Sequence, residues 1–332
     1  MQPVKLPDKR GKKTDVEHVE VSSGQVGRRI DNYLTGFLKN IPKTRIYRML
    51  RRGEVRVNGG RVKQDYRLQE EDIIRIPPLF KDSRSGQGEV LLIPPVRLQA
   101  IVRDSVIYED DFLLAINKPA GLAVHAGSGE QYGVIEVMRL LRPECASLEL
   151  VHRLDKLTSG CLLLAKEHRY LRELHEMLRE NRVQKRYIAL LYGKIPHKLE
   201  VALPLMKNEL RSGERMVQVD ASGKAARTVF YLEKYCHDAS LVRVEITTGR
   251  THQIRVHAAH CAHPVAGDPK YGNRDFNRTL RKAGLHRMFL HAESLTLQLP
   301  MTGKVTHISA PLTDELGMFL EKYCEVNEKE RD

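Results

Sequence analysis

Apolar residues near the N-terminus recur at the spacing of a helix. Ile30, Leu34 and Phe37 would form one apolar stripe. A short stretch before them, Val16–Val21, is typical of a strand. A second helix is predicted to begin at Pro42, because proline is tolerated in the first turn of a helix. The chain is therefore expected to open with a strand and two helices.

The apolar positions that follow alternate with polar ones. Val55 and Val57 alternate with polar residues and lead into Asn58-Gly59, a strong signal for a hairpin turn. Ile74 and Ile76 predict a further strand. Together with the two helices, these strands predict a small α/β domain.

The longer C-terminal part has more stretches typical of strands than of helices. Six apolar stretches predict strands: Phe112–Ile116, Cys161–Ala165, Tyr187–Leu191, Val229–Leu232, Leu241–Ile246 and Ser294–Leu299. Helices are predicted at about His168–Asn181, Thr251–Cys261 and Thr313–Cys324. Because strands mostly follow strands, the expected fold class is α+β with a mixed, largely antiparallel sheet flanked by helices.

Changes in composition divide the chain into four parts. An N-terminal extension and strand at 1–26 precede the small α/β domain at 27–78. Residues 79–105 contain Lys-, Ser- and Gly-rich sequence and a Pro-Pro pair, which is typical of an exposed linker. Periodic structure resumes after it, so a large C-terminal domain is expected at 106–332.

The charge balance indicates a polyanionic partner. The 332 residues include 55 Lys and Arg against 42 Asp and Glu, a formal net charge of +13. This excess favours nucleic acid over an anionic membrane. No apolar run approaches the roughly 20 residues that a spanning helix needs, and the polar N-terminus lacks the apolar stretch of a secretory signal. The five cysteines are scattered and odd in number, with no Cys-x-x-Cys pair, which fits a reducing cytoplasm.

The predicted helix after Pro42 has two different sides. Its apolar residues gather on one side: Ile46, Met49 and Leu50. Its arginines gather on the other: Arg45, Arg48 and Arg52. A row of charges is usually a solvated face, but these have one sign and no acidic residue at i±4. Arginines on a rigid helix suit phosphates, so this face is predicted to bind RNA.

One carboxylate stands among cations in the C-terminal domain. Asp155 lies close to His152, Arg153 and Lys156, and Thr158–Gly160 interrupts regular structure directly after it. A carboxylate on an RNA-binding surface repels phosphate, so a chemical role would explain its presence. Cationic neighbours favour the ionised form, which can act as nucleophile or base. The alternative is a surface ion pair of Asp155 with Arg153 or Lys156.

Two further stretches contain residues suited to the same chemistry. In Gly249–His257, Thr251 could cap a helix, so that His252 and Arg255 share a face and offer a cation to a carboxylate. In Gln184–Tyr187, an aromatic ring follows two cations. A tyrosine can stack on an extruded base and exchange a proton. The alternative is an ordinary strand tyrosine.

Four motifs in this order resemble the RluA-type family of pseudouridine synthases. They are Asn117–His125, Val151–Asp155 with Thr158–Gly160 after it, Gly249–His257, and His263–Gly272. The second is the family's most specific motif. The stretch Arg51–Gly59, after two helices, resembles the S4 RNA-binding domain. The resemblance covers essentially the whole chain, and it is strongest to members that modify large-subunit (23S) ribosomal RNA.

The resemblance implies a reaction and a role for each matching residue. Enzymes of this family cleave the N1–C1′ bond of a uridine, turn the uracil, and rejoin it through C5. Asp155 would be the essential carboxylate, Tyr187 would stack on the uracil and help to remove the C5 proton, and Arg255 would orient Asp155. Arg153 would fill the gap left by the flipped nucleotide. The other expected RNA contacts in the C-terminal domain are His152, Arg250 and His252.

The expected substrate is therefore 23S ribosomal RNA, with other ribosomal or transfer RNA uridines as an alternative. No cofactor or metal is expected, and the chain is expected to act as a monomer away from membranes. A non-catalytic RNA-binding or ribosome-assembly protein is a rival class, but it has no use for Asp155, Tyr187 and Arg255 together.

Other enzyme classes fit less well. A zinc site could be sought among His257, His260, Cys261 and His263, but three of these lie in one predicted helix, and no Cys-x-x-Cys pair or spaced carboxylate completes a ligand set. A serine hydrolase would need a Gly-x-Ser-x-Gly elbow, which Ser159 lacks. A paired-carboxylate glycosidase would need a second acid near Asp155, and the sequence indicates none.

Overall fold

The chain divides into two compact units. One is Met1–Pro95 with Glu167–Arg169, and the other is Val96–Lys166 with Tyr170–Asp332. The computed structural model describes residues 16–38, 41–78, 93–127, 130–145, 147–209, 215–299 and 302–325. Residues 1–15 of the expected N-terminal extension and 79–92 of the expected linker lie outside the described residues.

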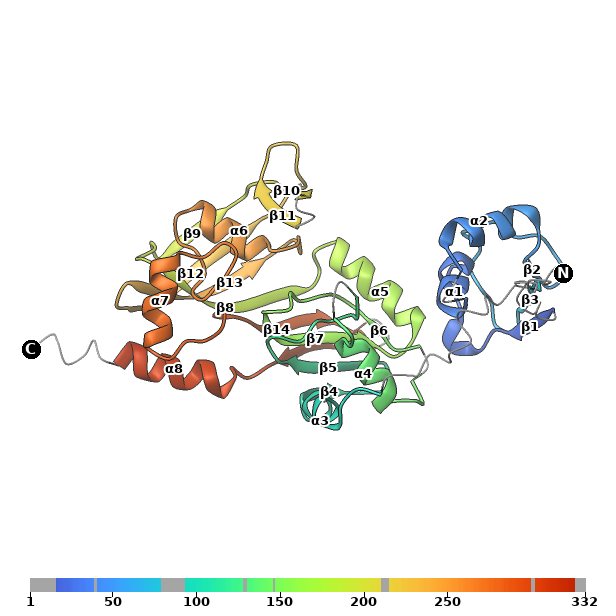
Figure 1. Ribbon diagram of the computed structural model, residues 1–332, viewed down its shortest axis with the longest axis horizontal. Coiled ribbons are helices and arrows are strands. Elements are labelled where there is room, and N and C mark those ends of the chain that lie inside the picture. The colour runs from blue at the N-terminus through green and yellow to red at the C-terminus, as the bar shows by residue number, and fades with distance from the viewer. Residues whose placement is uncertain are drawn as a thin grey trace, which may run out of the picture. The chain divides into compact units, whose positions relative to one another are not determined.

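The N-terminal unit packs two helices on a three-stranded antiparallel sheet of order β1-β3-β2 (Figure 1). Its elements are β1 (Glu17–Glu20), the short 3₁₀ helix η1 (Ser23–Gln25), α1 (Ile30–Phe37), α2 (Lys43–Arg52), β2 (Arg56–Val57) and β3 (Ile73–Ile76). The predicted strands and helices are thereby confirmed. Pro42 is the N-cap of α2 and lies just outside its first turn.

The apolar stripes predicted from spacing form the core of this unit. Ile30 and Leu34 of α1 pack with the apolar side of α2 and with Ile74 of β3. Phe37 is 40% exposed and lies outside the core. Asn58 and Gly59 both have positive φ (50° and 75°), as a two-residue hairpin turn requires.

The C-terminal unit is built on a ten-stranded sheet of order β4-β5-β7-β14-β8-β13-β12-β9, with β15 beside β14 and β6 beside β7 (Figure 1). The strands of this sheet are β4 (Val106–Glu109), β5 (Leu113–Lys118), β6 (Glu149–Leu150), β7 (Ser159–Ala165), β8 (Gln184–Tyr192), β9 (Lys198–Val201), β12 (Thr228–Cys236), β13 (Ala239–Ile246), β14 (Leu290–Gln298) and β15 (Val305–Ser309). A separate hairpin pairs β10 (Leu205–Glu209) with β11 (Arg215–Val219). All these pairings are antiparallel except β14 with β7. The α+β class is confirmed.

Helices cover both faces of this sheet. They are α3 (Val96–Asp104), α4 (Val134–Leu141), α5 (His168–Arg179), α6 (Gln253–His260), α7 (Arg274–Lys282) and α8 (Asp314–Glu325). Alternate residues of β7 enter different cores: Leu162 and Leu164 pack in a cluster with α4, while Leu163 packs in a cluster with α5. A strand buried on both faces is apolar throughout, which explains the uninterrupted run in the sequence.

Helix α3 lies inside the range expected to be a linker. Its Val102 is fully buried, and the helix packs against α4. The composition of the preceding residues is typical of an exposed linker, so it did not indicate this short helix, which has a single deeply buried side chain. The C-terminal unit therefore begins at Val96, earlier than expected from composition.

Gly160 fixes the place where the Asp155 loop enters the sheet. Its φ is +110°, and a Cβ at this position would lie 2.2 Å from the backbone oxygen of Ala292 on β14. Only glycine permits this approach of β7 to its parallel neighbour. The Ser-Gly of the sequence motif is thus the place where β7 pairs with its parallel neighbour β14.

Two of the scattered cysteines are joined. Cys236 at the end of β12 and Cys324 on α8 form a disulfide with an S–S distance of 2.03 Å. The spacing of the cysteines did not predict this pairing, because 88 positions separate the two residues, and a disulfide departs from the reduced thiols expected of a reducing cytoplasm. In the described part of the chain, no helix is both long and apolar enough to cross a membrane.

Candidate active site

Asp155 lies on a tight turn at one side of an open pocket. The backbone nitrogen of Thr158 donates to the backbone oxygen of Asp155 at 3.1 Å, and Leu154 is buried beneath the turn. The pocket is lined by Arg153–Asp155, Thr158, Tyr187, Ile246, Gly249–Arg255 and Leu290. All four sequence motifs contribute to it or to its support, although they come from distant parts of the chain.

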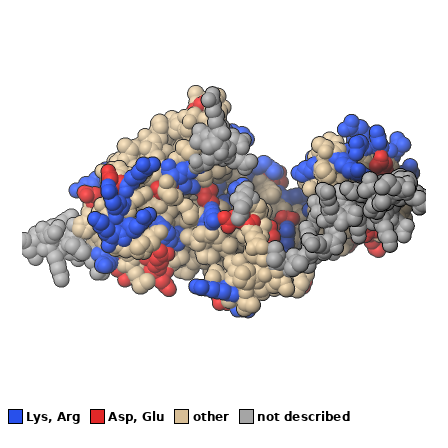
Figure 2. Space-filling view, viewed as in Figure 1, with Lys and Arg blue, Asp and Glu red and all other residues tan. Residues whose placement is uncertain are grey.

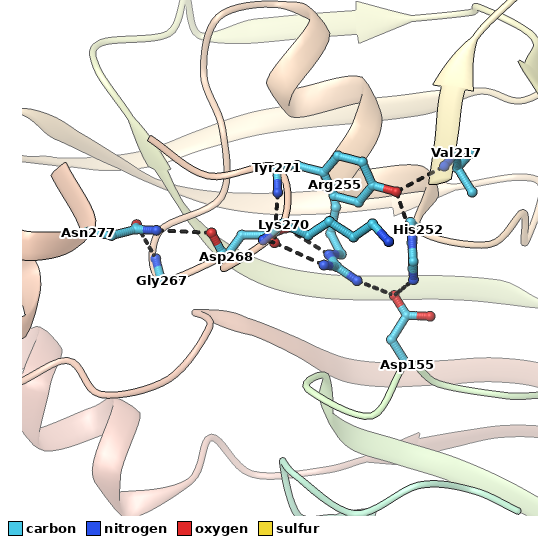
Figure 3. Close-up of polar contacts among 9 residues, drawn as sticks. All are labelled: Asp155, Val217, His252, Arg255, Gly267, Asp268, Lys270, Tyr271 and Asn277. Carbon is cyan, nitrogen blue, oxygen red and sulfur yellow. Dashed lines mark hydrogen bonds and ion pairs between the residues drawn. The ribbon is translucent and has the colours of Figure 1, made fainter. Parts of the chain in front are cut away.

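Asp155 contacts the two residues predicted to share a helix face. Arg255 Nη1 donates to Asp155 Oδ2 at 3.2 Å, and His252 Nε2 lies 3.8 Å from the same oxygen (Figure 3). Among the described residues, Oδ1 has no hydrogen-bond partner. The alternative surface pair with Lys156 is wrong, because Lys156 bonds to Glu130 instead.

Arg255 joins Asp155 to a second carboxylate that the sequence did not reveal. Its Nε and Nη2 donate to Asp268 at 2.7 and 2.9 Å (Figure 3). Burial disfavours the charge of Arg255, but the hydrogen bonds and charge of Asp268, and then of Asp155, more than offset it and raise the pKa of Arg255. The guanidinium is therefore a fixed cation between two carboxylates.

Asp268 is almost completely buried, at 1% exposed, and extensively bonded. Besides Arg255, it accepts hydrogen bonds from the backbone nitrogens of Lys270 and Tyr271. Burial alone would raise the pKa of Asp268, but Arg255 and the backbone donors outweigh burial and lower it. The expectation that no second acid lies near Asp155 is wrong. Asp268 does not line the pocket, however, so the pair is not the arrangement of a glycosidase.

His252 has an unusual backbone and a defined orientation. It is the N-cap of α6, with φ 54° in the left-handed region, so the predicted cap at Thr251 is wrong. Its Nδ1 is hydrogen-bonded to the Tyr271 hydroxyl at 2.9 Å, and this hydroxyl accepts from the Val217 nitrogen at 3.1 Å. The arrangement favours the tautomer with a proton on Nε2, facing Asp155. Burial lowers the pKa of His252 against the opposing charge of Asp155.

Tyr187 lies on β8 in the wall of the pocket and is only 9% exposed. Burial, and then the charge of Asp155, raise the pKa of Tyr187 far above its ordinary value. The two neighbouring cations bond elsewhere: Lys185 donates to the Thr247 oxygen and Arg186 pairs with Glu245. The hydroxyl is therefore neutral at neutral pH.

The remaining predicted contacts differ in accessibility. Arg153 is exposed at the rim of the pocket, and Arg250, also exposed, donates to the Ala225 oxygen at 3.1 Å. His152 does not present a cation to this surface. Its Nε2 accepts from the Leu163 nitrogen at 3.1 Å, and desolvation lowers the pKa of His152 to about 4. It ties the Asp155 loop to β7 as a neutral acceptor.

A buried lysine supports the same loop from below. Lys118 is 0% exposed and its ammonium donates to the oxygens of Pro119, Leu122 and Lys156. Burial lowers the pKa of Lys118 to about 7. The motif that contains it stands out in the sequence, but the partners of this side chain could not be inferred from spacing.

The histidines considered for zinc bond to their own chain. His257 contacts Thr228 and the Leu203 oxygen, and His263 contacts the Tyr192 oxygen. Within the ranges that the structure describes, no group of three metal-binding side chains is close enough to hold an ion.

The predicted basic face of α2 lies in the N-terminal unit. Ile46, Met49 and Leu50 are buried, as expected. Arg48 and Arg52 are exposed, whereas Arg45 is half-buried. Arg52 lies 3.9 Å from Glu54, an acidic neighbour outside the i±4 positions that were considered. Two of the three arginines therefore extend into solvent.

Comparison with known proteins assigns the class. Residues 112–260 match the model of the RNA pseudouridylate synthase family, and residues 28–74 match that of the S4 domain. The human RNA pseudouridylate synthase domain-containing proteins 1 and 4 have similar structures. The first has a TM-score of 0.54 and 26% identity over 65% of this chain and 86% of its own. The second has a TM-score of 0.57 and 25% identity over 68% of this chain and 95% of its own. This chain belongs to the RNA pseudouridylate synthase family.

More similar relatives narrow the position within the family. Ribosomal large subunit pseudouridine synthase C of Yersinia pestis is 48% identical over 91% of this chain and 93% of its own. The protein of the same name from Escherichia coli strain K12 is 49% identical over 92% and 96%. That of Haemophilus influenzae is 45% identical over 94% and 96%.

Proposed function

We propose that this chain isomerises uridine to pseudouridine in large-subunit (23S) ribosomal RNA, with Asp155 as the essential carboxylate. The observation that carries the proposal is the pairing of Asp155 with Arg255 inside the pocket, where one carboxylate oxygen is held and the other has no partner among the described residues. The similarity to ribosomal large subunit pseudouridine synthases supports the choice of RNA.

The reaction changes no oxidation state and needs no outside reactant. The N1–C1′ bond breaks, a C5–C1′ bond forms, the C5 proton leaves, and N1 gains a proton. Attack on C1′ and removal of the C2′ proton both require a carboxylate oxygen that faces the ribose. Arg255 and His252 hold Asp155 Oδ2, which leaves Oδ1 for that role.

The walls of the pocket suit a flat base. Tyr187 offers a ring for stacking, and Ile246 and Leu290 are apolar. The neutral Tyr187 hydroxyl would accept the C5 proton as its own proton passes to the carboxylate of Asp155, whose charge raises the pKa of Tyr187. Arg153 at the rim would fill the space left by the flipped nucleotide.

The two units would divide the work. The S4-like unit would supply affinity through Arg45, Arg48 and Arg52, and the C-terminal unit the chemistry, with Arg250 and His252 as further RNA contacts. The chain would act as a monomer in the cytoplasm, where ribosomal RNA is made, without a cofactor or metal.

The test is the effect of Asp155→Asn on pseudouridine formation. We expect the variant to bind 23S RNA transcripts with little change in affinity and to form no pseudouridine, because the amide cannot act as nucleophile or base. Asp104→Asn, which neutralises an exposed carboxylate of the same unit, is the matched control and should retain activity. Activity of Asp155→Asn within a few-fold of wild type would overturn the assignment.

The choice of substrate needs a separate measurement. Pseudouridines should be mapped in ribosomal and transfer RNA from a strain that lacks the gene, with and without wild-type protein. Missing 23S modifications that the wild-type protein restores are expected. Changes confined to transfer RNA would refute the ribosomal substrate and leave the chemistry standing.

A further inference from the structure

Helix α7 has a row of cations on its exposed side. Arg274, Arg278 and Arg281 are spaced at i, i+4 and i+7, so they lie on one face, with Lys282 beside them. All four are exposed. Figure 2 shows a dense basic area over this helix, at the left of the C-terminal unit. We call these four residues the α7 stripe.

The opposite side of α7 is anchored in a core. Phe276 and Leu280 are buried and pack with Leu285 and Phe289. Asn273 caps the helix by accepting from the nitrogens of Asp275 and Phe276. The arginines therefore project from a rigid support, which lowers the entropy cost of binding a ligand.

Helix stability does not account for the stripe. Cations in the last turn, such as Arg281 and Lys282, interact favourably with the helix dipole, but Arg274 stands in the first turn, where a cation is unfavourable. Asp275 is the only acidic residue of α7, and it pairs with Arg278. Within the described part of the chain, Arg274, Arg281 and Lys282 have no ion pair. The stripe is thus a net positive surface that can bind anions.

A chain of hydrogen bonds also links α7 to the candidate active site. Asn277 of α7 donates to the Asp268 oxygen at 2.9 Å and accepts from the Gly267 nitrogen at 2.8 Å (Figure 3). Asp268 in turn holds Arg255, which holds Asp155. A ligand that spans both surfaces would therefore contact one rigid assembly.

We propose that the α7 stripe binds the phosphate backbone of the substrate RNA, beyond the nucleotide that enters the pocket. Its length from Arg274 to Arg281 is about 10 Å, a span over which a nucleic-acid strand presents several phosphates. The inference rests on the proposed function in one respect: the bound strand is the one whose uridine lies at Asp155. It adds a second RNA-binding surface, separate from the basic face of α2.

The experiment neutralises the three arginines of the stripe in the full-length protein. Arg274, Arg278 and Arg281 are changed together to Gln, and binding to a transcribed 23S fragment is measured over a range of salt. We expect weaker binding, a rise in KM that exceeds any fall in kcat, and a smaller slope of log affinity against log salt. The slope should fall by about 0.7 for each single-strand phosphate that the variant no longer neutralises, or about 2 in all.

The matched control removes the same charge from other exposed sites of the C-terminal unit, namely Arg97, Arg103 and Lys304. Its slope should equal that of the wild type. Equal slopes for the stripe variant and the control would overturn the proposal, and an acidic protein would then be the partner to seek. Pseudouridine formation by the wild type is measured in parallel. If the wild type modifies no RNA, the proposed function fails, while the two salt slopes still decide the role of the stripe.

A variant that is expected to bind RNA more tightly separates the effect of charge from the effect of misfolding. Asp275→Asn removes the one acidic side chain of α7 and releases Arg278 from its ion pair. We expect tighter RNA binding and a steeper salt slope, which an unfolded protein cannot produce. Unchanged or weaker binding by this variant counts against the proposal.

Discussion

The pocket around Asp155 and the basic face of α2 hold their cations in opposite ways. Arg255 is buried and bonded on both sides, to Asp155 and to Asp268. Arg48 and Arg52 extend into solvent, and Arg52 makes only a distant contact with Glu54. In the pocket, we expect the position of each atom to decide the function. On α2, we expect only the sum of the charges to do so.

The largest effect on catalysis short of Asp155 should come from a single oxygen in the pocket. Tyr187→Phe keeps the ring for stacking but removes the hydroxyl that we expect to take part in removal of the C5 proton. General acid–base groups typically contribute about 10²–10⁴-fold, so product formation should fall by that order while RNA affinity changes little. The measurement is tritium release from C5-labelled uridine RNA. Near-normal release would leave Tyr187 as a stacking surface only.

A somewhat smaller effect should follow from keeping a charge but changing its shape. Arg255→Lys retains the cation, but an ammonium cannot contact Asp155 and Asp268 with the same planar geometry. The kcat should fall about a hundredfold, the order expected when a reacting group shifts by an ångström. Arg103→Lys is the control, because Arg103 is exposed on α3, makes one ion pair with Asp104 and should tolerate the change. Similar losses in both variants would show that the double contact of Arg255 is unimportant.

On the α2 face, three charges must be changed to obtain a comparable signal. With Arg45, Arg48 and Arg52 all replaced by Glu, RNA affinity should fall. The slope of log affinity against log salt should change by about 0.7–0.9 for each phosphate that the variant no longer neutralises. Conversion of uridine in a small RNA fragment at high enzyme concentration should persist, because the pocket is untouched.

The same reversal at Arg97, Arg103 and Lys304 of the C-terminal unit controls for net charge. An α2 variant whose salt slope matches the wild type would place RNA away from this face. A contribution from Arg48 and Arg52 without Arg45 would give an intermediate slope, as the partial burial of Arg45 suggests.

The smallest expected effect is on stability rather than activity. His152 is neutral in the folded protein, with its pKa lowered to about 4, whereas an unfolded histidine titrates near 6.5. Between these values the unfolded chain binds more protons than the folded chain. The contribution of His152 to stability is therefore fully present above about pH 6.5 and is lost as the pH falls toward 4. His152→Asn can still accept from the Leu163 nitrogen but cannot be protonated. Its free energy of unfolding should therefore fall less over this range. Parallel curves for variant and wild type would contradict this account.

The sequence predicted elements with a strong apolar pattern and missed those with a weak one. Strand β7, for example, was predicted from its uninterrupted apolar run. Helix α7 reads Arg-Asp-Phe-Asn-Arg-Thr-Leu-Arg-Lys, and only Phe276 and Leu280 give it an apolar side. The hairpin of β10 and β11 buries few of its own side chains, so its pattern of apolar residues is weak. The disulfide of Cys236 depends on where α8 packs, which spacing does not reveal.

The chemistry of single residues predicted more of the site than could be predicted of the contacts between those residues. The proximity of Asp155 to Arg255 and His252 is confirmed, while the roles given to these residues stay predictions. Asp268 was missed because it lies between a glycine and a proline, in a loop without periodicity. Its importance follows only from the partner that the fold brings to it. A buried carboxylate bonded to an arginine of the pocket is a tertiary feature.

The ion-pair chain from Asp155 through Arg255 to Asp268 also has a consequence for the time course of synthesis. Asp155 and Arg255 lie 100 positions apart, and Asp268 follows 13 positions later. A ribosome makes the chain from its N-terminus, so the α/β unit, with a core of its own, can fold long before these partners exist. Contacts between such distant residues also form late in folding. A growing chain would therefore carry its basic helix face first and complete its charge network near the end.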